Sequence, residues 1–114
     1  MRIFIALAVL ASLAACGGGD DATSGTRVIK SLGSLQCSGG GVTLAALQGQ
    51  LTAANVKVGS ATCGTDGLAG PTVCGSPDGK IGIFEISAEQ AGAAASAGFV
   101  PITSVPTAKA FPCA

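Results

Sequence analysis

The chain has 114 residues, six basic and six acidic side chains, and no histidine, tryptophan or tyrosine. Its length suits a single domain. The balanced and scattered charges form no basic patch, so the composition argues against binding to nucleic acid or to another polyanion. The same scatter of charge leaves no amphipathic helix for a membrane surface.

The first fifteen residues have the three parts of an export signal. Arg2 supplies the positive charge, residues 3–11 are apolar, and small residues follow before a cleavage position. The apolar run is too short to span a bilayer, which needs about 20 apolar residues. Ordinary secretory cleavage after Ser12-Leu13-Ala14 is one interpretation, because small side chains lie on both sides of Leu13.

The next residues favour a different cleavage. Leu13-Ala14-Ala15-Cys16 resembles the lipobox of bacterial lipoprotein precursors. The resemblance implies that the thiol of Cys16 receives a diacylglycerol, that signal peptidase II cuts before Cys16, and that this lipid holds the protein on a membrane. Five cysteines in an exported protein leave one unpaired, and lipidation of Cys16 accounts for it. The remaining four form an even set for disulfides: Cys37, Cys63, Cys74 and Cys113.

The leader divides the chain into three predicted regions. Residues 1–15 are the signal peptide, residues 16–26 a lipidated, glycine-rich tether, and residues 27–114 one small domain. Gly17 follows the cysteine in place of the aspartate that resembles an inner-membrane retention signal, so the analogy implies the outer membrane, on its periplasmic side. Because a domain of this size has a small apolar core, we expect disulfides to stabilise it, each by roughly 2 to 4 kcal/mol.

Hydrophobic periodicity predicts the elements of the first half of the domain. Residues 27–36 are expected to form a strand with a bulge at Gly33, although a helix fits their apolar spacing equally well. Residues 42–54 have helical spacing, and Asn55 can adopt the left-handed conformation that ends a helix. Residues 56–62 alternate between apolar and polar side chains, which predicts a strand.

The second half predicts a strand, a helix and a last strand. Residues 81–86 have the strongest strand pattern of the chain. Ser87-Ala88-Glu89-Gln90 has the form of a capping box, and the alanine-rich helix that it opens is expected to end at Gly98-Phe99. Pro101 restricts the strand predicted at residues 100–105 to an edge of the sheet or to a strand start.

The order strand, helix, strand, strand, helix, strand predicts an α+β fold. Its compact arrangement is a disulfide-stapled split βαβ, ferredoxin-like sandwich (βαββαβ), with both helices on one face of an antiparallel sheet. If residues 27–36 are helical instead, the domain becomes a three-stranded α+β structure.

Loop length predicts which cysteines pair. Cys63 and Cys74 are 11 positions apart with turn residues between them, and a short loop costs the least entropy to close. Elimination then pairs Cys37 with Cys113, which the extended tail over residues 106–113 carries across about 26 Å. Four cysteines allow three connectivities, and the sequence leaves the other two open.

The turns of this region carry the candidate metal ligands. Asp66 and Asp78 each precede a glycine, which predicts turn residues, with a calcium site as the alternative. A zinc site made of four thiols is disfavoured, because successive cysteines are 26, 11 and 39 positions apart and no Cys-x-x-Cys pair is present. We therefore expect neither a metal nor a cofactor.

Catalytic motifs are missing from the sequence. It has neither Gly-x-Ser-x-Gly nor Ser-x-x-Lys, and Glu85 and Glu89 fall at a strand end and in the first turn of a helix. We expect a non-enzymatic, lipid-anchored protein of the cell envelope. Its expected partners are the membrane, through Cys16, and an envelope protein or peptide that binds an open sheet face or an edge strand. The alternative is a small-ligand or metal-binding envelope protein that uses the loop from Asp66 to Asp78, and a hydrolase ranks last.

Overall fold

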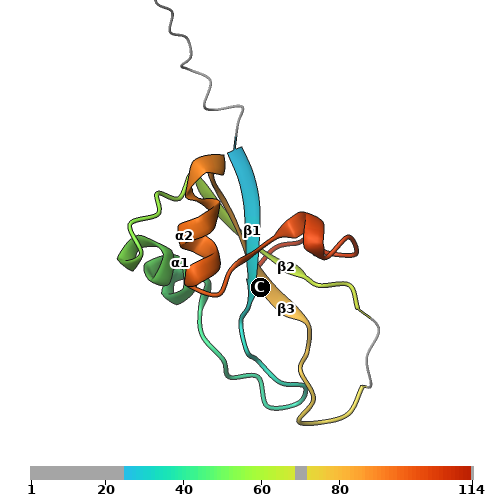
Figure 1. Cartoon of the computed structure of the whole chain (residues 1–114). Helices are drawn as coiled ribbons and strands as arrows, with labels where there is room; N and C mark the ends of the chain where they lie inside the picture. The colour runs from blue at the N-terminus through green and yellow to red at the C-terminus, as the bar shows by residue number, and fades with distance from the viewer. Residues whose placement is uncertain (1–24, 69–71, 114) are drawn as a thin grey trace, which may run out of the picture.

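A five-stranded antiparallel sheet forms the centre of the domain in the computed structural model, which describes residues 25–68 and 72–113 (Figure 1). The strands lie in the order β4-β1-β3-β2-β5, so β3 is the central strand. The predicted α+β class is confirmed, whereas the predicted signal peptide and Cys16 lie outside the described residues. The elements in chain order are β1 (Gly25–Ser31), α1 (Leu44–Ala53), β2 (Ser60–Thr65), β3 (Lys80–Ser87), α2 (Ala91–Ser96), β4 (Val100–Pro101) and β5 (Lys109–Ala110).

Strands were predicted within residues 27–36 and at residues 81–86, and both form, as β1 and β3, which pair with each other. Their register places Gly25 opposite Ser87 and Ser31 opposite Ile81, so the two ends of β1 mark the two ends of the sheet. The strand interpretation of residues 27–36 holds only as far as Ser31. A bulge at Gly33 was wrong, because β1 ends at Ser31 and Gly33, with a φ of 74°, lies beyond the strand.

Both helices cover one face of the sheet, and the main core lies beneath them (Figure 1). The ring of Phe84 from β3 meets the ring of Phe99 edge to face, with centroids 5.7 Å apart. Aromatic pairs favour this geometry because the positive edge of one ring faces the negative face of the other. The buried residues of this core are Val28, Leu47, Leu51, Val56, Phe84, Ile86, Ala94 and Phe99.

Local signals define the helix ends. Thr43 begins α1 by accepting a hydrogen bond from the backbone N–H of Ala46, and Asn55 follows the helix with the predicted positive φ, at 66°. Gly98 has a φ of 94° after α2, and the buried Phe99 donates its N–H to the carbonyl oxygen of Ala94, as the predicted C-terminal cap requires.

The capping box predicted at Ser87 was wrong. The Ser87 side chain makes no capping hydrogen bond, and residues Ala88–Gln90 form a 3₁₀ turn before α2. The side chain of Gln90 instead crosses to the segment after α1, donating to the carbonyl oxygen of Asn55 and accepting from the N–H of Lys57. A long-range bond therefore takes the place of the local one.

The strand predicted at residues 56–62 forms further along the chain, as β2. Val56 donates its N–H to the carbonyl oxygen of Leu51 and packs in the core. It therefore belongs to the segment that follows α1 and not to the strand. Pairing with β3 begins only at Ser60, opposite Glu85.

The sheet face opposite the helices was expected to be open, and part of it is covered. Ile29, Ile81 and Ile83 on this face pack against partly buried side chains of the segment that follows β4: Ile102, Val105 and Ala108. The strand predicted at residues 100–105 contains only Val100–Pro101. It lies at an edge of the sheet, which is one of the two positions to which Pro101 was expected to restrict it. A 3₁₀ turn at Ile102–Ser104 then leads the chain across the face to β5.

Candidate functional site

The four described cysteines form two disulfides, and the pairing differs from the prediction. Cys37 pairs with Cys74, and Cys63 pairs with Cys113, each with a Cα–Cα distance of 5.0 Å. The predicted pairs Cys63–Cys74 and Cys37–Cys113 are wrong because the loop argument describes an unfolded chain. In the folded domain Cys63 lies inside β2, where the C-terminal tail reaches it, and Cys74 lies in the loop between β2 and β3.

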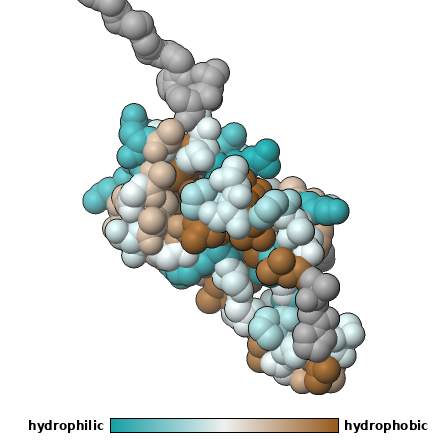
Figure 2. Space-filling model, turned by 45° about the vertical axis from the view of Figure 1, so that its right-hand side comes forward, coloured by the Kyte–Doolittle hydropathy of each residue, from teal (hydrophilic) through white to brown (hydrophobic). Residues whose placement is uncertain are grey.

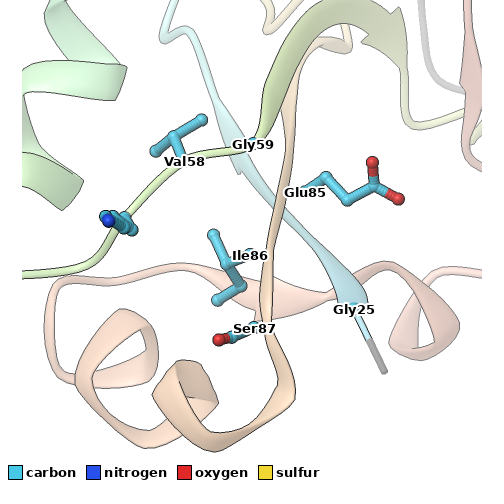
Figure 3. Close-up of a pocket in the computed structure, with 7 residues that line it drawn as sticks. Gly25, Val58, Gly59, Glu85, Ile86 and Ser87 are labelled. Carbon is cyan, nitrogen blue, oxygen red and sulfur yellow. The ribbon is translucent and has the colours of Figure 1, made fainter. Parts of the chain in front are cut away.

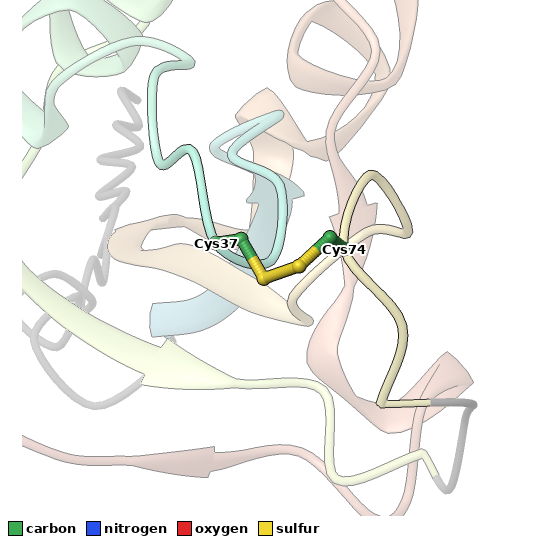
Figure 4. The surroundings of a disulfide bond; sticks show 2 residues. All are labelled: Cys37 and Cys74. Atoms are coloured by element: carbon green, nitrogen blue, oxygen red, sulfur yellow. A yellow bond between two sulfur atoms is a disulfide. The ribbon is translucent and has the colours of Figure 1, made fainter.

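The Cys37–Cys74 disulfide joins two long loops beyond the end of the sheet (Figure 4). One loop connects β1 to α1 and the other connects β2 to β3. Their backbones also bond directly, because Gln36 donates to the carbonyl oxygen of Ser76 and accepts from the N–H of Gly75. The two loops therefore form one projection, at the end of the sheet away from Gly25 (Figure 1).

A groove of about 370 Å³ lies where this projection meets the sheet. Its lining comes from the segment between β1 and α1, from β2, from the start of β3 with the residues before it, and from the C-terminal tail. Leu32, Val42 and Phe111 are its large apolar side chains. The complete lining is Leu32, Ser34, Gly39, Gly40, Val42, Cys63, Gly64, Asp78, Lys80, Phe111, Pro112 and Cys113.

A small polar network forms part of the groove. Ser34 is buried, and its hydroxyl donates to Oδ1 of Asp78 at 2.9 Å. The backbone N–H of Lys80 donates to the same oxygen at 3.0 Å. Burial alone would raise the pKa of Asp78, but these two hydrogen bonds and the charge of Lys80 outweigh it and hold the pKa below its ordinary value. Asp78 is therefore an ionised, oriented acceptor in this groove.

The aspartates singled out in the sequence act as turn residues, as predicted. Oδ1 of Asp66 accepts the N–H of Leu68, and Oδ1 of Asp78 accepts the N–H of Lys80, two residues on in each case. The backbone N–H of Asp66 donates to the carbonyl oxygen of Gly79, so the two turns lie side by side. Within residues 25–68 and 72–113, no three cysteine, aspartate or glutamate side chains are grouped as metal ligands would be.

A second hollow, of about 290 Å³, lies at the other end of the sheet (Figure 3). It adjoins Gly25, where β1 begins. Val58 and Ile86 supply its apolar side chains, whereas Glu85 points to the opposite side of β3 from Ile86 (Figure 3). Lys57, Gly59 and Ser87 complete the lining together with Glu85.

Exposed apolar side chains gather at the end that carries the groove. Of the six large exposed apolar residues in the described chain, only Val100 lies elsewhere, in β4. Leu35, Leu68 and Val73 are exposed in the two loops of the projection, and we call these three side chains the apolar tip. Figure 2 shows hydrophobic surface on a small lobe at one end of the domain. Val42 and Phe111 are the other two and line the groove. The sequence analysis did not predict this surface. The one local signal for it is the presence of large apolar residues within glycine-rich loops.

No protein-family model, no curated protein and no solved structure matches this chain. Among the residues that the structure describes, no helix is both long enough and apolar enough to cross a membrane.

Proposed function

We propose that this protein is a lipid-anchored envelope lipoprotein whose domain binds an extended, apolar peptide segment of another envelope protein. The anchor is the lipid on Cys16, as the lipobox resemblance implies, and the protein faces the periplasm from the outer membrane. The domain has no enzymatic role. Its fold is the split βαβ, ferredoxin-like arrangement with β5 added at one edge. The strand order β4-β1-β3-β2 and the placement of both helices on one face support this fold.

The placement of the exposed apolar residues carries the binding proposal. The described chain begins at Gly25, on the side of the predicted tether, and the groove and the apolar tip lie at the other end of the sheet. A domain anchored through Gly25 thus presents its exposed apolar surface away from the attachment point. Exposed apolar side chains that gather at one end of a domain are typical of interaction sites.

The chemistry of the groove indicates what binds there. Its charged side chains are one carboxylate, Asp78, and one ammonium group, Lys80, so it favours an occupant without net charge. Its apolar walls suit apolar side chains. The volume of about 370 Å³ is near the lower end of the roughly 300 to 1,000 Å³ typical of small-molecule sites, which suits a few side chains of a longer peptide.

The edge of β2 shows how an extended chain can lie beside the groove. β5 pairs with Gly64 and Thr65 only, and the N–H of Phe111 donates to the carbonyl oxygen of Cys63. This edge therefore already accepts an extended segment in antiparallel register. The alternative, a small-ligand or metal-binding protein that uses the loop from Asp66 to Asp78, has less support because both carboxylates bond to the backbone of their own turns.

Site-specific photo-crosslinking in intact envelopes tests the proposal. A photoreactive amino acid is placed at position 42, in the groove, or at position 100, in β4. Val42 and Val100 are equally suited because they are 42% and 43% exposed. We expect a defined adduct from position 42, mapped by mass spectrometry to one apolar segment of one partner, and none from position 100. Equal adducts from both positions, or none from position 42, would contradict the proposal.

A further inference from the structure

The two disulfides interleave along the chain. Cys37 pairs with Cys74 and Cys63 pairs with Cys113, so each bridge encloses one cysteine of the other. The sequence separations of the native pairs are 37 and 50 positions. Neither native bridge joins neighbouring cysteines of the sequence.

An unfolded chain favours different pairs. Cys63 and Cys74 are 11 positions apart, and the probability of closing a flexible loop falls with about the 3/2 power of its length. Relative to this pair, contact is about sixfold rarer for Cys37–Cys74 and about tenfold rarer for Cys63–Cys113, from the separations of 37 and 50 positions. Formation of Cys63–Cys74 removes one cysteine from each native bridge.

The order in which the cysteines leave the export channel acts in the same direction. Chains emerge from the N-terminus, so Cys37 and Cys63 meet an oxidising compartment first and Cys74 follows. Cys63 must wait for Cys113, the last cysteine of the sequence. Both early bridges available to Cys63, with Cys37 or with Cys74, are non-native.

We propose that this protein is a substrate of a dithiol disulfide isomerase, which must convert mispaired chains to the native Cys37–Cys74 and Cys63–Cys113 bridges. In the cell the proposal rests on the export proposed above. The chemistry itself resides in the four cysteines and can be tested outside the cell.

The exchange is balanced and needs no net oxidant or reductant. A thiolate of the isomerase attacks Cys63 in the Cys63–Cys74 bridge, forming a mixed disulfide and releasing the Cys74 thiolate. Cys74 attacks Cys37 in the Cys37–Cys113 bridge and releases the Cys113 thiolate. Cys113 then attacks Cys63 in the mixed disulfide, which forms the second native bridge and returns the isomerase thiolate. Two protein disulfides exist before and after.

Reoxidation of the full chain carrying Cys16→Ser tests the proposal. The chain is reduced in denaturant, diluted, and oxidised with diamide, either alone or followed by a dithiol isomerase with reduced glutathione. Free thiols are alkylated at intervals, and bridges are mapped by mass spectrometry. With diamide alone we expect Cys63–Cys74 to exceed Cys37–Cys74 about sixfold among the first single bridges, from the loop lengths. The isomerase should then raise the native pairing several-fold.

The control adds Cys37→Ser and Cys74→Ser to the same chain. Only Cys63–Cys113 can then form, so the isomerase should leave its final yield unchanged. Native pairing as the main product of diamide alone would overturn the proposal, and so would mispaired chains that the isomerase leaves unchanged. An equal gain in the control would also overturn it, because the enzyme would then be acting as an oxidant. These outcomes are independent of the anchor and of the groove.

Discussion

The ammonium group of Lys30 lies 5.1 Å from the centroid of the Phe99 ring. Its Nζ also donates hydrogen bonds to the carbonyl oxygen of Ala97, at 3.0 Å, and to Oε1 of Gln50, at 2.7 Å. One side chain of β1 thus contacts α1, the C-terminal end of α2 and the aromatic pair of the core. A cation at this end of α2 also complements the helix dipole.

Replacing Lys30 with methionine should therefore destabilise the domain. Methionine retains most of the apolar stem but loses the charge and both hydrogen bonds, and we expect a loss of about 1 to 3 kcal/mol in the free energy of unfolding. Urea denaturation measures it. Lys57→Met is the control because Lys57 is exposed, and its effect should stay within about 0.5 kcal/mol. Equal losses in the two variants would show that Lys30 does not connect the helices to β1.

Gly64 allows the C-terminal tail to lie against β2. A Cβ atom at this position would lie 2.5 Å from the carbonyl oxygen of Lys109 and 2.7 Å from Cδ1 of Ile83. We expect Gly64→Ala to cost about 1 to 3 kcal/mol and to speed hydrogen exchange at the Phe111 amide, which bonds to Cys63. Gly49→Ala, in α1 and facing open space, should instead stabilise the protein by up to about 1 kcal/mol. An unchanged exchange rate at Phe111 in Gly64→Ala would contradict the tail placement.

The pKa of Asp78 predicts an acid-sensitive contribution to stability. Hydrogen bonds from Ser34 and Lys80 hold this pKa below its ordinary value of 3.8 in the folded state. The ionised group therefore stabilises the fold at pH values above 3.8, and this contribution is lost as the pH falls through the lower folded pKa. In Asp78→Asn the free energy of unfolding should fall at neutral pH and vary less between neutral and acidic pH. A pH dependence identical to that of the wild type would contradict this role.

Attachment to the membrane depends on Cys16 if the lipobox interpretation is right. Cys16→Ser should abolish labelling of the protein with a fatty acid and leave an uncleaved or differently cut precursor. The domain disulfides should be retained, because Cys37, Cys63, Cys74 and Cys113 pair with one another. Labelling and peptide mapping of the same sample measure both properties. Normal fatty-acid labelling of the variant would exclude the lipobox.

Local signals made much of the fold predictable. The apolar run of β3 and the helix endings at Asn55 and Gly98 depend on neighbouring residues, and each was placed correctly from the sequence. The missing N–H of Pro101 restricted its strand to an edge or a strand start, and β4 lies at an edge. These features are encoded within a few residues of where they appear.

Long-range contacts explain what the sequence did not predict. The disulfide pairing follows from the meeting of two loops and from the tail on β2, neither of which has a local signal. The covered face depends on residues 102–108 returning across the sheet. The groove is built from four segments of the chain, so Ser34, Val42 and Phe111 could not be assigned to one site from the sequence alone.

The central claim, that the end of the sheet opposite Gly25 binds peptide, is tested most directly by nuclear magnetic resonance. The isotope-labelled full chain is titrated with the apolar peptide that crosslinks to position 42. We predict shifts in the amide signals of Leu32, Val42, Cys63 and Phe111, with little change at Lys57 and Glu85. Shifts confined to the hollow beside Gly25, or a peptide that leaves the groove signals unchanged, would contradict the account.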